Sequence, residues 1–282
     1  MGFSGSTFYS TVDQKYLVKS LPRRSEHSFF SEDLLTPYVE YMASHPRSLL
    51  VRIFDFLAIS GLSIGRVLRS APSHHIIMDN IMHGQEEAKR KGEPEWENWD
   101  LKPTSYFYPE RDIAGGALTS DATKNKLADE FHDKIILHRE QAEDFFSSLE
   151  QDTKLLADHN AVDYSLFLVR MKAPRQETAS ARPHQPNSGP STVPIQQSSG
   201  PPTLPSWRTG VTSADGKHIF RASILDFFWA KHKVHAKAMT LLIKLWNLLI
   251  NRHGDMSITT TPDEYRQRFL KMCREIVEIT DD

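Results

Sequence analysis

Cysteine is almost missing from this sequence of 282 residues, and so are long apolar runs and any excess of charge. The single cysteine, Cys273, excludes an internal disulfide framework and a multi-cysteine zinc site, and it favours a reducing compartment. No apolar run reaches membrane-spanning length, and the opening segment lacks the apolar core of a signal peptide. The net charge of −2 gives no general attraction to nucleic acid or anionic lipid, so such a partner would need a local basic patch.

Proline is concentrated in residues 171–206, which hold eight of the sixteen prolines and few large apolar side chains. Such a segment cannot bury enough surface to offset the entropy of ordering it, so we expect a disordered insertion there. The sequence after it is short for a self-sufficient core. We therefore expect both flanking parts to complete one domain.

Hydrophobic periodicity predicts a β-hairpin around Asp13 and Gln14 and a helix over residues 25–42, which Pro37 should kink or split. A second helix is predicted over residues 140–158. Further strands are predicted in three segments: "SLLVRIFDFLAI", "HHIIMDNIM" and "KHIFRASILDFF". This order of elements indicates an α+β fold with two lobes rather than a series of βαβ units.

The last helix has a clear start. Thr261 is the predicted N-cap, Pro262 occupies the first helical position, and Glu264 completes a capping box. The residues expected to form its buried stripe are Tyr265, Phe269, Met272 and Ile276.

Three charged residues lie where apolar sequence makes burial costly. Lys19 in "KYLVKSL" either meets an anionic partner inside a buried strand or extends its ammonium into water from a strand end. Asp163 in "NAVDYSLFLVR" either acts chemically or caps a turn between helix and strand. Asp226 in "SILDFFW" is surrounded by apolar residues, so it is either functional or half of a structural salt bridge.

Together these residues fit the needs of phosphoryl transfer, which are a backbone loop over phosphates, a lysine, and carboxylates near the metal and the nucleophile. Gly2 and Gly5 precede the first strand, where a phosphate-covering loop would lie. "MGFSGST" also resembles a myristoylation signal at Gly2. The sequence lacks H-R-D-L-x-x-x-N and D-F-G, which disfavours an ordinary protein kinase.

Over nearly its whole length the chain resembles the catalytic domain of phosphatidylinositol phosphate kinases. "GFSGSTFY" matches the family's glycine loop GxSGSxFY, and "AVDYSLF" resembles its IMDYSLL strand. The other matching segments, in chain order, are "YLVK", "HPRSLL", "DLKPTS", "SILD" and "TPDEYRQRF". The resemblance implies a two-lobed, SAICAR synthetase-like α+β fold with antiparallel sheets and flanking helices. Residues 1–81 would form the N-lobe, shortened at its start, and residues 82–282 the C-lobe.

The same resemblance implies an ATP- and magnesium-dependent lipid kinase. Lys19 would bind ATP phosphates with the glycine loop of Gly2, Gly5 and Ser6, and Asp226 would bind magnesium. Asp163 would serve at the catalytic centre. The remaining assignments are Asp100 and Lys102 from the "DLK" motif at the reacting phosphate, Met78 and Asn80 at the adenine pocket, and Glu26 or Glu32 as the partner of Lys19.

The substrate would be a phosphoinositide at the cytosolic face of a membrane, bound peripherally. The basic segment after Asp226 contributes Lys231, Lys233 and Lys237, each worth about 1 kcal/mol near an anionic leaflet. Its alternative interpretation is a solvated helical face. The ending "MSITTTPDEYRQRF" leans slightly toward the phosphatidylinositol-3-phosphate 5-kinase branch.

Pro103 replaces the family's glycine and removes a backbone N–H beside the phosphates. A catalytically impaired phosphoinositide-binding or scaffold protein is therefore the second hypothesis, and a soluble small-molecule kinase or ligase is the third. The lipid-kinase hypothesis predicts that Lys19, Asp163 and Asp226 converge on one cleft between two lobes.

Overall fold

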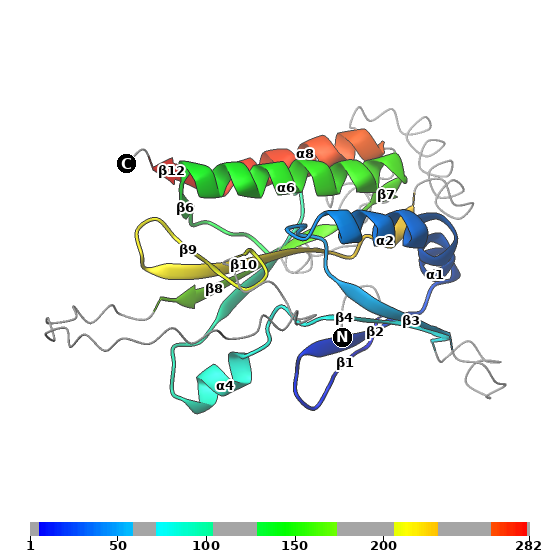
Figure 1. The fold of residues 1–282 in the computed structure, drawn as a ribbon, viewed down its shortest axis with the longest axis horizontal. Helices are drawn as coiled ribbons and strands as arrows, with labels where there is room; N and C mark the ends of the chain where they lie inside the picture. The colour runs from blue at the N-terminus through cyan, green and yellow to red at the C-terminus, as the bar shows by residue number, and fades with distance from the viewer. Residues whose placement is uncertain (1–5, 59–71, 104–128, 174–205, 231–260, 281–282) are drawn as a thin grey trace, which may run out of the picture.

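The computed structural model describes residues 6–58, 72–103, 129–173, 206–230 and 261–280. In these parts, helices combine with strands that are mostly antiparallel, as predicted for an α+β fold. Two four-stranded sheets, called the first sheet and the second sheet below, are joined by helices and two smaller strand pairs (Figure 1). The two-lobed arrangement stays a prediction.

The first sheet has the strand order β1-β2-β4-β3, and every neighbouring pair is antiparallel. Its strands are β1 (Phe8–Ser10), β2 (Tyr16–Leu21), β3 (Ile53–Ala58) and β4 (His74–Asp79). β1 and β2 form the predicted hairpin. The Asp13 carboxylate closes its turn by accepting hydrogen bonds from the Thr11 hydroxyl at 2.6 Å and the Lys15 N–H at 3.1 Å.

The helix predicted over residues 25–42 is interrupted, as expected from Pro37. It consists of α1 (Arg24–Phe29), a π-helical segment η1 (Phe30–Leu34) and α2 (Leu35–Ser44). Pro37 lies in the first turn of α2, where a missing backbone N–H costs least. The interruption therefore falls just before the proline.

The second sheet has the order β5-β8-β10-β9 and is also antiparallel throughout. Its strands are β5 (Glu97–Leu101), β8 (Ser165–Lys172), β9 (Val211–Thr212) and β10 (His218–Leu225). β8 and β10 are central and paired over their full length. Their burial explains the apolar runs "SLFLV" and "ASIL".

The predicted insertion, residues 171–206, is wrong at both edges. Met171 and Lys172 belong to β8, and Met171 is buried opposite Ile219 of β10. Ser206 opens a turn, and its carbonyl accepts the backbone N–H of Gly210 at 2.7 Å. Trp207 within that turn is buried in the core. Composition alone could not locate these boundaries, because the buried apolar residues at each end stand next to proline-rich sequence. Residues 174–205 lie outside the described residues.

α6 (Arg139–Asp158) and α8 (Pro262–Glu275) pack side by side over the second sheet, on the side away from the first sheet (Figure 1). The parallel pair β6 (Ile135–His138) and β12 (Val277–Thr280) adjoins them. The remaining elements are α4 (Gln85–Arg90), β7 (Ala161–Val162) and β11 (Trp229–Ala230). None of the helices in the described ranges is long and apolar enough to cross a membrane.

α8 begins as predicted. The Thr261 hydroxyl accepts the Glu264 N–H at 3.2 Å, the Glu264 carboxylate accepts the Thr261 N–H at 2.6 Å, and Pro262 occupies the first position. Tyr265 and Phe269 of the predicted stripe are completely buried. Ile276 is buried just beyond the helix, while Met272 is only partly buried.

The buried carboxylate of Asp152 on α6 connects three parts of the fold. It accepts hydrogen bonds from the hydroxyls of Tyr41 on α2 and Ser48, both at 2.7 Å, and from the Leu49 N–H at 2.6 Å. The segment held in this way pairs with the end of β10, since the Ile224 N–H donates to the Leu49 carbonyl at 2.7 Å. Asp152 thus secures the contact between the helices and the strand that precedes Asp226.

Asp152→Asn should lower the free energy of unfolding by about 1–3 kcal/mol, because the new amide N–H₂ group faces donors in a buried site. Asp158→Asn on the same helix is the matched control, because the Asp158 carboxylate is exposed and forms a surface ion pair with Lys154 at 2.7 Å. Its effect should stay within about 0.5 kcal/mol. Urea denaturation of both variants measures the difference, and equal losses would contradict the role given to Asp152.

Candidate active site

Three chain segments that carry predicted site residues end at one edge of the second sheet. The antiparallel register aligns Leu101 of β5, Leu166 of β8 and Ile224 of β10 in one row. Lys102 and Asp226 follow just beyond this row, and Asp163 comes shortly before it, ahead of the start of the middle strand β8. Register alone therefore gathers residues that are far apart in sequence.

Asp163 and Asp226 occupy equivalent corners of the fold. Asp163 lies between β7 and β8, and Asp226 lies between β10 and β11. Because β8 pairs with β10 and β7 pairs with β11, each of these two segments of the chain turns from one strand pair into the other at its aspartate. Both corners need left-handed backbone, with φ of 66° at Asp163 and 64° at Asp226. Aspartate tolerates this conformation better than most residues, which fits its use at both positions.

Lys19 enters from the first sheet and contacts Asp226. Its side-chain ammonium forms an ion pair with Asp226 Oδ1, and Lys19 as a whole is only 3% exposed. The rings of Phe8 and Phe228 flank the ammonium, each with its centroid 5.4 Å from Nζ. The predicted anionic partner is therefore confirmed, and extension of Lys19 into water is excluded.

Lys102 forms the second ion pair of the site, with its Nζ 2.7 Å from Asp163 Oδ1. Although burial opposes its charge, the carboxylates of Asp163 and then Asp226 raise the pKa of Lys102. Burial likewise works to raise the pKa of Asp226, but the ammonium groups of Lys19 and Lys102 outweigh it and lower that pKa. The two ion pairs thus form one cluster, as the predicted convergence of Lys19, Asp163 and Asp226 requires.

Glu26 is better placed than Glu32 to join this cluster. Glu26 on α1 is buried, and burial raises the pKa of its carboxyl despite Arg23, whose Nη1 lies 3.3 Å from Oε1. Lys19 and Asp226 are both close enough to act on its charge. Glu32 is exposed on the π-helical segment. The contact made by Lys19 is nevertheless with Asp226, not with either glutamate.

The other predicted residues occupy varied surroundings. Asp100 lies on β5, where its N–H donates to Asp129 Oδ2 at 2.7 Å and its charge acts on Lys102. Met78 and Ser6 are buried, and the Asn80 side chain donates to the Gln14 carbonyl at 2.7 Å. Nucleotide binding by these residues stays a prediction. The predicted residues outside the described ranges are Gly2, Gly5, Lys231, Lys233 and Lys237.

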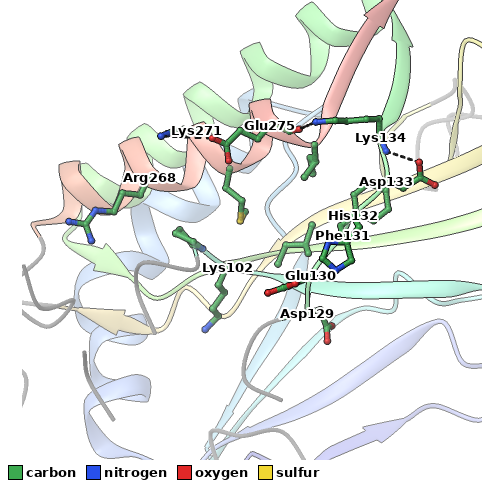
Figure 2. Close-up of a pocket in the computed structure, with 14 residues that line it drawn as sticks. Lys102, Asp129, Glu130, Phe131, His132, Asp133, Lys134, Arg268, Lys271 and Glu275 are labelled. Carbon is green, nitrogen blue, oxygen red and sulfur yellow. Dashed lines mark hydrogen bonds and ion pairs between the residues drawn. The ribbon is translucent and has the colours of Figure 1, made fainter. Parts of the chain in front are cut away.

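A pocket of about 490 Å³ lies between α8 and the segment that precedes β6, with Lys102 in its wall. Figure 2 shows the residues that line it. Arg268 and Lys271 come from α8, and Lys134 comes from the opposite segment. Arg268 has no salt-bridge partner in the described parts of the chain, whereas Lys271 faces Glu275 at 3.8 Å. The sequence identified Arg268 only as part of a motif, and no spacing pointed to Lys134 or Lys271.

Within the described ranges, no three His, Cys, Asp or Glu side chains gather closely enough to hold a metal by themselves. Magnesium needs no such cage, because it binds through one or two carboxylates together with substrate phosphates and water. The Asp163 and Asp226 side chains are 38% and 34% exposed, respectively, so both carboxylates are accessible. The residues at the cluster therefore fit a metal held jointly with a nucleotide.

Comparison with known proteins agrees with this geometry. The family model described as Phosphatidylinositol-4-phosphate 5-Kinase matches residues 1–276. The chain belongs to this kinase family. A probable phosphatidylinositol phosphate kinase of Dictyostelium discoideum is 29% identical over 184 residues, which cover 64% of this chain and 23% of that protein.

Two further relatives carry the name phosphatidylinositol 4-phosphate 5-kinase. The Plasmodium falciparum protein is 28% identical over 169 residues, covering 59% of this chain and 9% of its own length. Kinase 7 of Arabidopsis thaliana is 28% identical over 179 residues, covering 62% of this chain and 21% of its own length. The chain thus matches less than a quarter of each of these relatives. Their names lend no support to the lean toward the 3-phosphate branch.

The ion pair between Lys19 and Asp226 should make stability depend on acidity. Because the folded-state pKa of Asp226 lies below its ordinary value of 3.8, the ionised carboxylate stabilises the fold above that value. This contribution is lost as the pH falls through the lowered pKa. Asp226→Asn should therefore be less stable than the parent near neutral pH, and the gap should close below about pH 4. Urea denaturation across this pH range measures the gap; a gap that widens in acid would contradict the pairing.

Proposed function

We propose that this chain is the catalytic domain of a lipid kinase, which transfers the γ-phosphate of ATP to an inositol-ring hydroxyl of a phosphatidylinositol phosphate. The observation that carries the proposal is the cluster of Lys19, Lys102, Asp163 and Asp226 in a member of this family. Positioned cations and carboxylates are the main protein contribution to phosphoryl transfer. The family's two-lobed arrangement would place ATP between the first and second sheets.

Each charged residue has a distinct role in this proposal. Lys19 would leave Asp226 to bind ATP phosphates, and Asp226 with Asp163 would hold magnesium, which neutralises charge on the phosphates when bound. Asp163 would orient the accepting hydroxyl. Lys102 would stabilise charge on the transferred phosphate, because its raised pKa keeps it protonated. Glu26 would take over the Lys19 ammonium when phosphate binds, since it lies close to that charge.

The pocket beside Lys102 supports a headgroup site. It opens next to the proposed reacting phosphate, and Arg268 on its wall lacks a counter-ion within the described chain. A guanidinium binds phosphate through two parallel hydrogen bonds, which suits the phosphate that the substrate already carries. Lys134 and Lys271 also line the pocket, together with the carboxylates of Asp129, Glu130, Asp133 and Glu275, so Arg268 is the cation that carries this assignment. Lys231, Lys233 and Lys237 would bring the domain to an anionic membrane on its cytosolic side.

The second candidate is a phosphoinositide-binding member of the family that no longer phosphorylates its lipid. Two observations favour it: Pro103 follows Lys102 without a backbone N–H, and both ammonium groups of the cluster already have carboxylate partners. This protein would bind lipid vesicles but release no phosphorylated product.

Incubation with labelled ATP, magnesium and vesicles containing each phosphatidylinositol monophosphate should yield a labelled bisphosphate. Asp226→Asn should reduce kcat by a factor of about 100 or more, because it removes the proposed metal-binding charge while asparagine still tolerates the left-handed backbone. Asp158→Asn, an exposed carboxylate on α6, is the control and should leave kcat unchanged.

The same assay separates the rival functions. Vesicle binding without any labelled lipid would support the binding module and overturn the kinase proposal. Labelling of a soluble acceptor in the absence of vesicles would support a small-molecule kinase instead. Chromatographic separation of the product isomers identifies the hydroxyl that accepts the phosphate.

Arg268→Gln should raise the KM for phosphoinositide by about tenfold and leave the KM for ATP unchanged, because one charge-assisted phosphate contact is lost. Arg274→Gln is the matched control, since Arg274 lies on the same helix but pairs with Glu150 at 2.7 Å outside the pocket. Steady-state kinetics with mixed vesicles measures both constants. If Arg268→Gln raised only the KM for ATP, the lipid headgroup would not bind in this pocket.

A further inference from the structure

The corner at Asp163 requires a support that the second sheet alone does not supply. Its left-handed backbone, with φ of 66°, costs about 1–2 kcal/mol relative to ordinary conformations. Asp163 lies between β7, which has two residues, and the start of β8. A strained conformation persists only when surrounding contacts determine it.

Tyr265 on α8 provides such a contact. Its hydroxyl donates a hydrogen bond to the backbone carbonyl of Tyr164, the residue that follows Asp163. Its ring also packs edge-on against the Tyr164 ring, with centroids 4.7 Å apart and planes at 79°. Both side chains are completely buried. The Asp163–Tyr164 backbone is thereby fixed to the first turns of α8.

The start of α8 is itself firmly held. The reciprocal hydrogen bonds of Thr261 and Glu264 fix its first turn, and the Tyr265 N–H donates to the Thr261 carbonyl at 2.9 Å. Burial, followed by the charge of Asp163, raises the pKa of Tyr265 well above 10, so its hydroxyl remains a donor at all physiological pH values. The first turn of α8 is therefore fixed, and the Tyr265 hydroxyl on it keeps its proton.

We propose that Tyr265 is a positioning residue for the reaction: its hydroxyl holds the Tyr164 carbonyl and thereby aims the Asp163 carboxylate at Lys102 and the accepting hydroxyl. This inference rests on the kinase function proposed above. The same helix carries Arg268 one turn further on, in the wall of the pocket. α8 thus sets the spacing between the proposed headgroup site and Asp163.

The neighbouring tyrosine offers a matched control. Tyr164 is as buried as Tyr265 and packs in the same aromatic cluster with Phe269, 4.9 Å between ring centroids. Its hydroxyl has no hydrogen-bond partner among the described residues. Tyr164→Phe and Tyr265→Phe therefore remove the same atom from adjacent rings, but only the second breaks a contact with the corner.

Tyr265→Phe should lower kcat by about ten- to a hundredfold with the KM for ATP unchanged, since misplacing a reacting group by about 1 Å has an effect of this size. Tyr164→Phe should change kcat less than about twofold. Stoichiometric binding of a non-hydrolysable ATP analogue corrects both values for the folded fraction. Equal losses in both variants, or an unchanged kcat in Tyr265→Phe, would overturn the proposal.

A double-mutant cycle tests whether Tyr265 acts through Asp163. In the Asp163→Asn background, Tyr265→Phe should cause no further loss of kcat, because the group that it aims is already removed. Independent, additive losses would show a general structural role and refute positioning.

Hydrogen exchange separates a failure of this proposal from a failure of the kinase function. The Tyr265→Phe change should speed exchange of the Ser165 amide, at the start of the β8–β10 ladder, by about tenfold or more, while Tyr164→Phe leaves it protected. This readout needs no turnover. Faster exchange without any lipid product would retain the role of Tyr265 at the corner and reject the kinase activity, whereas unchanged exchange would reject the positioning role.

Discussion

The ion pair between Lys19 and Asp226 is the constraint on which the arrangement of the site depends. Lys19 belongs to the first sheet and Asp226 follows the second, so their contact fixes one sheet against the other. A buried ammonium is tolerated only with a partner, and removing either member leaves an uncompensated charge. The rings of Phe8 and Phe228 flank the Lys19 ammonium of this pair. The apposition of the two sheets and the proposed chemistry therefore rest on the same residues.

The second sheet explains why carboxylates converge beside this pair. β8 pairs with β10, and β7 pairs with β11, both antiparallel. One chain segment therefore runs from β7 into β8 and another from β10 into β11, so each passes from one strand pair to the other. Each crossing requires one left-handed residue, and the crossings lie at the same edge because the register is antiparallel. Asp163 and Asp226 occupy them. A requirement of backbone geometry thus coincides with the placement of two carboxylates, and Lys102 at the end of β5 balances their charge.

Much of this could be predicted from the sequence where the determinants are local. The hairpin at Asp13 and the capping box at Thr261 follow from residues a few positions apart. Buried charge in apolar surroundings likewise identified Lys19 and Asp226. The pairing of Lys102 with Asp163 could not be predicted, because it depends on strand register across 61 positions of sequence. The choice of Glu26 over Glu32 depends on which side of an interrupted helix faces the first sheet, and a π-helical turn changes that side.

The charge balance of the cluster has a consequence for ligand entry. Each ammonium is held by a carboxylate, so the site is close to neutral as it stands. A polyanionic nucleotide alone would compete with Asp226 for Lys19 and leave that carboxylate beside phosphate, which is unfavourable. A nucleotide that arrives with a divalent cation avoids this cost, because the cation takes the carboxylate as the phosphates take the ammonium. The ion pairs would therefore favour the magnesium complex over free nucleotide, while holding the Lys19 and Lys102 side chains in place until it binds.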